Sequence, residues 1–134
     1  MIIWSIEKIK NKKGFTFIEL VLVIAVLGIL STIAVPKYTS SWESAERTAV
    51  EANLRTIDSA IAIYEAQNGS LPEGSKIEDL VGKTLQSKPK GPGDAVYDIN
   101  YDKTNKVWKA IVSGNVGGKQ LDKQSLPIDW KQSE

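Results

Sequence analysis

The chain has 134 residues, of which 42% are hydrophobic, and its 17 basic and 16 acidic side chains give a formal net charge of +1. It contains no histidine and no cysteine, so it lacks the commonest general base, a thiol nucleophile and any disulfide. A chain of this length corresponds to one domain. The composition argues against catalysis, and no cofactor is expected.

Residues 1–14 form a basic leader. It carries four lysines and one glutamate, a net charge of +3. Because positive charge is retained on the cytoplasmic side of a membrane, the leader places the N-terminus in the cytoplasm and everything after Tyr38 outside. Without the leader the chain has 13 basic and 15 acidic residues. No direct nucleic-acid binding is therefore predicted.

Residues 15–38 are predicted to be a transmembrane helix. Leu20 to Pro36 carries no charge, and a helix from Phe15 to Tyr38 would span about 36 Å. Glu19 lies inside this stretch, where a carboxylate costs about 2.5–3.5 kcal/mol on insertion scales. We therefore expect a partner charge or a function for Glu19. The alternative is that its side chain extends to the membrane surface, since it lies about one helical turn from Phe15.

The junction Gly14-Phe15-Thr16-Phe17-Ile18-Glu19 resembles the processing and methylation signature of type IV pilins and of the pseudopilins of type II secretion and competence systems. The resemblance covers the leader and the first half of the chain, and beyond about Gly69 only the layout is similar. It implies that a prepilin peptidase cuts after Gly14 and methylates the new amino terminus of Phe15. It also implies that Glu19 pairs with the amino terminus of a neighbouring subunit during assembly.

Gly28 and Pro36 bracket a segment in which the helix is weakened. Glycine costs about 1 kcal/mol relative to alanine, and proline removes a backbone hydrogen bond. In the pilins that the chain resembles, a similarly placed stretch unwinds in the assembled filament, so the same is expected of residues 28–36. A simple kinked membrane helix remains the alternative.

Residues 39–68 are predicted to be the amphipathic half of the same helix. Apolar residues recur every three to five positions, at Tyr38, Trp42, Ala45, Ala49, Leu54, Ile57, Ile61 and Tyr64. Asn68-Gly69-Ser70 and Pro72 end the pattern. A helix from Phe15 to about Gln67 would be roughly 80 Å long. So small a domain cannot bury it, so its first half must contact membrane or other subunits.

Residues 69–134 are predicted to form a small, loop-rich β-sheet head. Ser75 and Glu78 indicate a capping box for a short helix near residues 76–81, and residues 88–93 form an exposed loop. Residues 97–102 and 107–113 alternate as a hairpin whose inner face carries Tyr97, Ile99, Tyr101, Trp108, Ala110 and Val112. A third strand within residues 115–123 has weaker support. The predicted class is α+β and pilin-like, with the long N-terminal helix packed on a small antiparallel sheet.

Asp98, Asn100 and Asp102 place oxygen ligands at alternate positions, as at the start of a calcium loop. The rest of that pattern is missing, because Lys103 stands where glycine is needed and Lys109 where a bidentate glutamate is needed. The alternative is that the three residues form the solvated face of a strand. Tyr38 and Trp42, just past the membrane stretch, are typical of an interfacial aromatic belt.

These features predict a structural subunit of a type IV pilus, which polymerises through its N-terminal helix into a surface filament for adhesion, twitching motility or DNA uptake. The resemblance to pilins implies that its partners are copies of itself, the prepilin peptidase, the assembly platform and ATPase, and the cytoplasmic membrane before assembly. After assembly, it would lie in an extracellular pilus or cell-envelope filament. Open helical polymers arise from head-to-tail contacts of this kind.

Two alternatives remain open. The first is a pseudopilin. The compact head and the absence of the disulfide loop that many Gram-negative pilins carry favour either a pseudopilin or a Gram-positive pilin, whereas the missing calcium ligands favour a pilin. The second is a secreted soluble domain, cut by an ordinary signal peptidase after Thr32-Ile33-Ala34. That cut would discard Glu19 and leave its charge unexplained.

Overall fold

The computed structural model of the protein describes residues 14–131, so most of the predicted leader lies outside the described residues. One long helix, α2, covers Phe17–Asn68 and is followed by the short 3₁₀ helix η1 at Ile77–Asp79. Three strands complete the fold: β1 at Val96–Asp102, β2 at Val107–Val116 and β3 at Lys119–Gln124. The predicted helix is confirmed, beginning two residues later and ending one residue later than expected. Gly69 ends it in the left-handed conformation, with φ of 82°.

The chain divides into two compact units at Thr39 and Ser40. In the first unit the described residues consist of a short N-terminal segment and the first part of α2. Its large apolar side chains are exposed, from Phe17 at 83% to Val35 at 62%. Of the helices in the described segment, α2 is the one long and apolar enough to cross a membrane. This unit therefore presents a continuous apolar surface.

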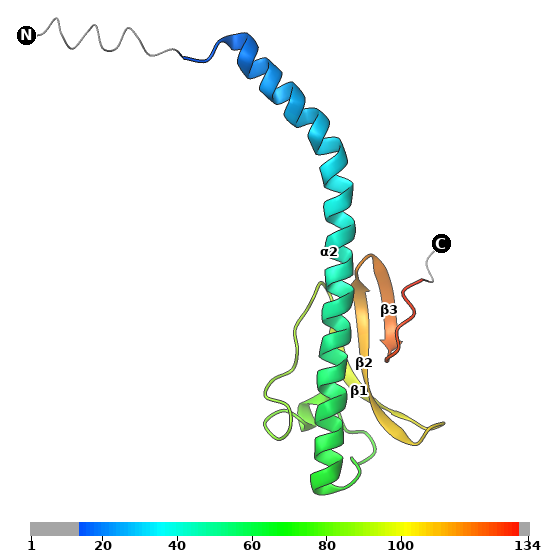
Figure 1. The fold of residues 1–134 in the computed structure, drawn as a ribbon. Coiled ribbons are helices and arrows are strands. Elements are labelled where there is room, and N and C mark those ends of the chain that lie inside the picture. The colour runs from blue at the N-terminus through cyan, green and yellow to red at the C-terminus, as the bar shows by residue number, and fades with distance from the viewer. Residues whose placement is uncertain (1–13, 132–134) are drawn as a thin grey trace, which may run out of the picture. The chain divides into compact units, whose positions relative to one another are not determined.

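The second unit is an α+β head in which the sheet packs on the C-terminal part of α2 (Figure 1). The strands are antiparallel in the order β1-β2-β3. The predicted hairpin face is confirmed, because Tyr97 pairs with Val112, Ile99 with Ala110 and Tyr101 with Trp108. All six side chains are buried or half-buried. The helix contributes Val50, Leu54, Ile57, Ala60 and Ile61 to the same core.

The turn between β2 and β3 explains why both strands differ from expectation. β2 continues three residues past the predicted end, and β3 begins only at Lys119. At the turn, the Gly117 N–H donates to Glu46 Oε2 at 2.8 Å, and Arg47 Nη2 donates to Gly117 O at 2.7 Å. A Cβ at Gly117 would lie 2.8 Å from the Glu43 carbonyl oxygen. Only glycine allows the turn to approach the helix this closely.

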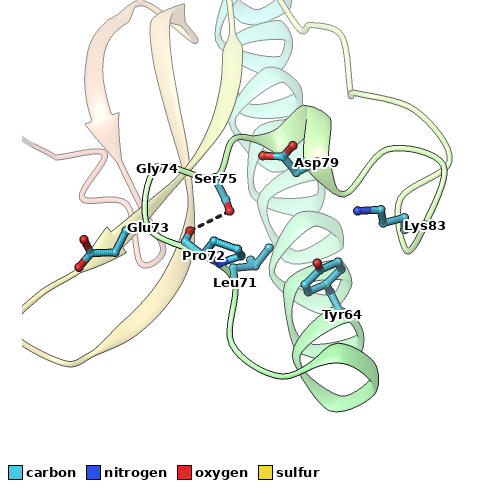
Figure 2. A pocket seen from close by; sticks show the side chains of 8 residues that line it. All are labelled: Tyr64, Leu71, Pro72, Glu73, Gly74, Ser75, Asp79 and Lys83. Atoms are coloured by element: carbon cyan, nitrogen blue, oxygen red, sulfur yellow. Dashed lines mark hydrogen bonds between the residues drawn. The ribbon is translucent and has the colours of Figure 1, made fainter.

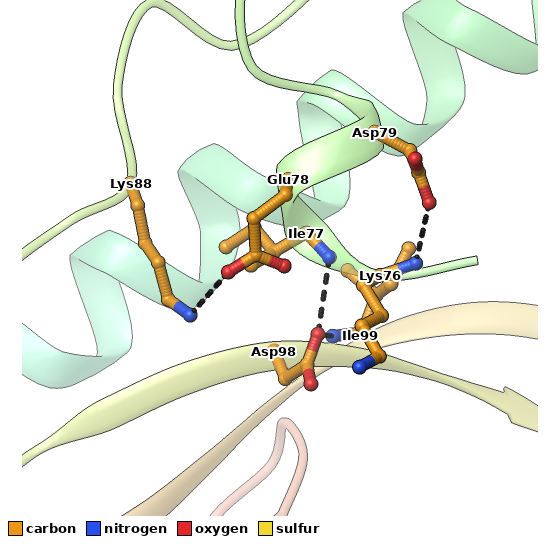
Figure 3. A network of polar contacts seen from close by, with 7 residues as sticks. All are labelled: Lys76, Ile77, Glu78, Asp79, Lys88, Asp98 and Ile99. Carbon is orange, nitrogen blue, oxygen red and sulfur yellow. Dashed lines mark hydrogen bonds and ion pairs between the residues drawn. The ribbon is translucent and has the colours of Figure 1, made fainter. Parts of the chain in front are cut away.

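The predicted capping box at Ser75 and Glu78 is wrong. Ser75 Oγ instead donates to Pro72 O at 2.8 Å (Figure 2). The carboxylate that reaches back belongs to Asp79, whose Oδ2 accepts the Lys76 N–H at 2.8 Å (Figure 3). Glu78 pairs with Lys88 at 2.9 Å. The short helix therefore starts one residue later than predicted and is a 3₁₀ turn.

Asp98 fixes this 3₁₀ turn to the sheet. Its Oδ1 accepts the backbone N–H groups of Ile77 at 3.0 Å and Ile99 at 2.9 Å (Figure 3). Ile77 is fully buried beside these bonds. A carboxylate that accepts two backbone donors is a strong local anchor, and it lets Ile77 enter the core.

A second polar contact joins helix, strand and loop inside the head. Tyr97 is fully buried, and its hydroxyl donates to Gly91 O at 2.7 Å. Asn53 Nδ2 donates to the same hydroxyl at 3.0 Å and to Gly91 O at 3.2 Å. Burial raises the pKa of the Tyr97 hydroxyl, and the hydrogen bond from Asn53 opposes this in part. The hydroxyl is thus held in its protonated form.

We expect Tyr97 to make the stability of the head depend on alkaline pH. Because its pKa is higher in the folded than in the unfolded chain, its contribution is complete below about pH 10 and is lost as the pH rises above that value. Tyr97→Phe should cost about 1–3 kcal/mol at neutral pH, because it strips partners from Asn53 and Gly91. The free energy of unfolding of the variant should also fall less steeply above about pH 10 than that of the wild type. Unfolding of the detergent-solubilised chain, followed by near-UV circular dichroism across this range, measures both effects.

Tyr38→Phe is the matched control, because Tyr38 is 72% exposed in the first unit. It should leave the pH profile of the wild type unchanged. Identical alkaline profiles for the wild type and Tyr97→Phe would contradict the role given to the buried hydroxyl.

Candidate assembly site at the helix N-terminus

The predicted processing junction lies in a non-helical, exposed segment. Gly14 and Phe15 precede the first helical residue, Phe17, and the Phe15 side chain is 90% exposed. A Cβ at Gly14 would meet nothing within 4 Å. The peptide bond between the two residues is therefore accessible in this structure, as a protease needs.

Glu19 caps the start of its own helix. The backbone N–H of Thr16 donates to Glu19 Oε2 at 2.7 Å, and the Glu19 N–H donates to Thr16 Oγ1 at 3.3 Å. This reciprocal pair is a capping box, and the negative charge also complements the positive end of the helix dipole. Sequence reasoning missed it, although threonine followed three residues later by glutamate is its known signature.

The capping box leaves room for a second partner. A carboxylate can accept several hydrogen bonds, so Glu19 can cap α2 and still bind an ammonium group. Cleavage after Gly14 would create such a group on Phe15, four residues away in the same chain. The arrangement can therefore join a free amino terminus to Glu19 either within one chain or between two.

The segment between Gly28 and Pro36 is helical throughout in this structure. Pro36 lacks an N–H, which removes the usual helical donor to the Thr32 carbonyl. Two hydroxyls in the segment bond to backbone carbonyls: Ser31 Oγ to Leu27 O and Thr32 Oγ1 to Ile29 O, each at 2.7 Å. Unwinding in an assembled filament stays a prediction.

The structure does not bring Asp98, Asn100 and Asp102 together as a metal site. Asp98 holds η1, and Asp102 caps the hairpin turn by accepting from Thr104 N at 2.9 Å and Asn105 Nδ2 at 2.7 Å. The side-chain hydrogen bond from Asn105 is the main cause that lowers the pKa of the Asp102 carboxyl. Within residues 14–131, no group of three or more acidic, histidine or cysteine side chains is placed to hold a metal ion. The two aspartates thus have structural roles, and calcium binding remains without support.

Comparison with known proteins identifies the N-terminal motif. Residues 9–35 match the family model of the prokaryotic N-terminal methylation motif. Type II secretion system core protein G of Pseudomonas aeruginosa is 32% identical over 127 residues, which cover 92% of this chain and 88% of that protein. A type IV major pilin protein of Neisseria gonorrhoeae is 33% identical over 104 residues, or 73% of this chain and 49% of that protein.

Coverage varies among the relatives. Core protein G of Pectobacterium carotovorum is 31% identical over 87 residues, or 63% of this chain and 56% of that protein. The chain thus spans about half the length of this relative and of the gonococcal pilin. No solved structure matches.

The relatives are structural pilins and pseudopilins and not enzymes. The methylation motif, the apolar first half of α2 and the α+β head agree with this group. The chain belongs to the family of type IV pilins and type II secretion pseudopilins.

Proposed function

We propose that the chain is a structural subunit of a helical filament, cut after Gly14, N-methylated at Phe15 and polymerised through the first half of α2. One observation carries the proposal. A membrane-length apolar helix surface is left exposed, and its lone carboxylate, Glu19, lies one turn from an accessible cleavage junction. An apolar surface of this size needs either lipid or other protein to cover it.

Charge pairing would set the stagger between neighbouring subunits. Two separated charges in an apolar environment are each costly, and bringing them within about 4 Å offsets much of that cost. Pairing within one chain competes with pairing between chains, because Phe15 and Glu19 are neighbours in sequence. Pairing between chains is favoured when the exposed apolar faces of neighbouring subunits also pack together, because this packing is available only between subunits.

Before assembly the subunit would lie in the cytoplasmic membrane with its N-terminus in the cytoplasm and its head outside. The excess of lysine in the leader supports this orientation. Its partners would be the prepilin peptidase, the assembly platform, the ATPase and further copies of itself. The filament would leave the membrane as each apolar helix exchanges lipid for neighbouring helices.

Two kinds of filament fit the chain. One relative that aligns over most of both proteins is a type II secretion core protein G, which favours a short secretion filament. The alignment with the gonococcal type IV major pilin covers less of each protein. We therefore place the secretion filament first and the surface pilus that the sequence alone favoured second.

Two substitutions separate the charge of Glu19 from its capping role. Glu19→Gln keeps the shape and can still cap the helix, but it cannot form an ion pair. Filament yield should fall at least about tenfold, which corresponds to about 1.4 kcal/mol per subunit contact. Thr16→Val removes the capping hydroxyl and keeps the charge. It should weaken the helix start by about 1 kcal/mol and leave filaments largely intact.

The measurement is the amount of sheared filament relative to membrane-bound subunit. Both variants should still enter the membrane and lose the leader, as a mass measurement of each checks. Normal filament yield from Glu19→Gln would contradict the proposed pairing.

Deletion of the gene in its own host distinguishes the two filaments. If the subunit builds a secretion filament, extracellular proteins should accumulate inside the cell while long surface fibres remain. If it builds a pilus, the fibres should disappear and the secreted proteins should be unchanged. The readouts are the proteins in the culture medium and electron microscopy of the cells, and complementation with wild type and Glu19→Gln supplies the control. A host unaltered in both would contradict the proposed filament.

A further inference from the structure

The face of the sheet opposite α2 carries a hollow of about 290 Å³ near the end of the hairpin. Trp108 and Ala110 are buried in the core that the sheet shares with α2. Lys109 and Ile111 alternate with them along β2 and so lie on the opposite face. Asn100 pairs with Lys109 across β1 and β2 and shares that face. These three outer residues line the hollow, which is therefore a feature of the outer surface of the head.

The hollow has an excess of positive charge. Three lysines from separate segments line it: Lys103 of the hairpin turn, Lys109 of β2 and Lys123 of β3. Among the described residues that line it, Asp102 alone is acidic, so three positive charges against one negative charge give a formal net charge of +2. Within residues 14–131, the side chains of Lys103 and Lys123 make no hydrogen bond or ion pair. Their charges are therefore available to a ligand.

The Asp102 carboxylate is engaged by the hairpin turn. It accepts the backbone N–H groups of Thr104 at 2.9 Å and Asn105 at 3.2 Å, and the side-chain amide of Asn105 at 2.7 Å. Lys109 Nζ lies 3.7 Å from Asp102 Oδ2, which is beyond hydrogen-bond distance, so this surface ion pair is weak. A carboxylate of a ligand could approach Lys109 more closely and leave the turn intact.

Lys123 lines the hollow from an irregularity in β3. Where β2 passes from Val112 to Gly114, β3 contains one extra residue. In the resulting bulge, Lys123 has a φ of 46° and donates its N–H to Ser113 Oγ at 3.0 Å. This left-handed conformation suits glycine and is unfavourable for a residue with a side chain. Because strained residues of this kind are concentrated at functional sites, a lysine at a position that favours glycine indicates a function for its charge.

We propose that this hollow binds an acidic segment of a partner polypeptide, in which two carboxylates pair with Lys109 and Lys123. The Asn100 amide and the Ser125 hydroxyl also line the hollow and supply further donors. The methylene groups of a glutamate side chain would pack on the half-buried Ile111. Two negative charges match the net charge of +2. A nucleic acid would need an extended positive surface, which three lysines beside one aspartate do not provide.

Titration of the full chain in detergent micelles tests this assignment. The probe is the blocked peptide acetyl-Gly-Glu-Glu-Gly-amide, and its Gln-Gln counterpart, which has the same length without the charges, is the control. ¹⁵N-labelled protein should show shifts at the amides of residues 100–103, 109–111 and 123–125, with a dissociation constant of about 1–10 mM at low ionic strength. The Gln-Gln peptide should cause none of these shifts.

Lys123→Gly separates the charge of this residue from its backbone conformation. Glycine adopts a φ of 46° without strain, so the head should unfold at the same temperature as the wild type or a higher one. Binding of the Glu-Glu peptide should nevertheless weaken about threefold to fivefold, and Lys109→Ala should weaken it to a similar extent.

Lys106→Gly is the matched control. Among the described residues, Lys106 is the other non-glycine residue with a positive φ, at 55°, and it lies in the hairpin turn outside the lining of the hollow. The substitution makes the same change of side chain and backbone as Lys123→Gly. It should leave the dissociation constant within about twofold of the wild-type value, because exposed charges that do not meet the ligand are screened by solvent and salt.

No shift with the Glu-Glu peptide up to about 100 mM would overturn the assignment, as would equal shifts with the Gln-Gln peptide. So would an unchanged dissociation constant for Lys123→Gly and Lys109→Ala, or equal losses in Lys123→Gly and Lys106→Gly. Inorganic phosphate that binds as tightly as the Glu-Glu peptide would overturn it in favour of a simple anion site. The binding is measured on the unassembled chain, so its failure leaves the filament proposal standing.

Discussion

The exposed apolar surface of residues 15–35 is the constraint to which the rest of the protein is fitted. Burial of apolar side chains is worth about 25 cal/mol per Å², so a helix face of this length is stable only in lipid or against other helices. The head, in contrast, buries its apolar side chains within itself. Its strands and the amphipathic part of α2 bury a closed core, led by Leu54, Ile57 and Tyr97, and leave a surface suited to water.

Glu19 is the one charged residue of this apolar stretch; the structure shows that it caps α2, and the proposed filament would give it a second use. In the isolated chain its carboxylate accepts the Thr16 N–H and so completes the first turn of α2. The same carboxylate is suited to receive the positive charge that cleavage after Gly14 would create. Because the Glu19 carboxylate already accepts a hydrogen bond within its own helix, its burial in the membrane before assembly costs less free energy than burial of an unbonded carboxylate. Capping and assembly are therefore compatible roles for one side chain.

The local patterns in the sequence predicted much of the fold. The period of the apolar residues gave the helix and its end at Asn68-Gly69, and alternation gave the hairpin with Tyr97, Ile99 and Trp108 inside. The errors arose where distant contacts decide. Asp98 selects the 3₁₀ turn from 21 residues away, and Glu46 and Arg47 hold the Gly117 turn from about 70 residues away. No local pattern reports such contacts.

The candidate site shows a different limit. Thr16 and Glu19 have the spacing of a capping box, but from the sequence we interpreted Glu19 only as a charge within an apolar stretch. The contacts of the Tyr97 hydroxyl could not be foreseen, since they join β1 to Asn53 of α2 and to Gly91 of a loop. Residues brought together from separate elements require the fold itself.

The most direct test of the proposed filament is the intact mass and N-terminal residue of the protein taken from its native membrane and from sheared filaments. We expect a chain that starts at N-methylated Phe15 in both fractions, with Glu19 retained. A chain that starts at Val35, or one that keeps Met1 in the filament fraction, would contradict it.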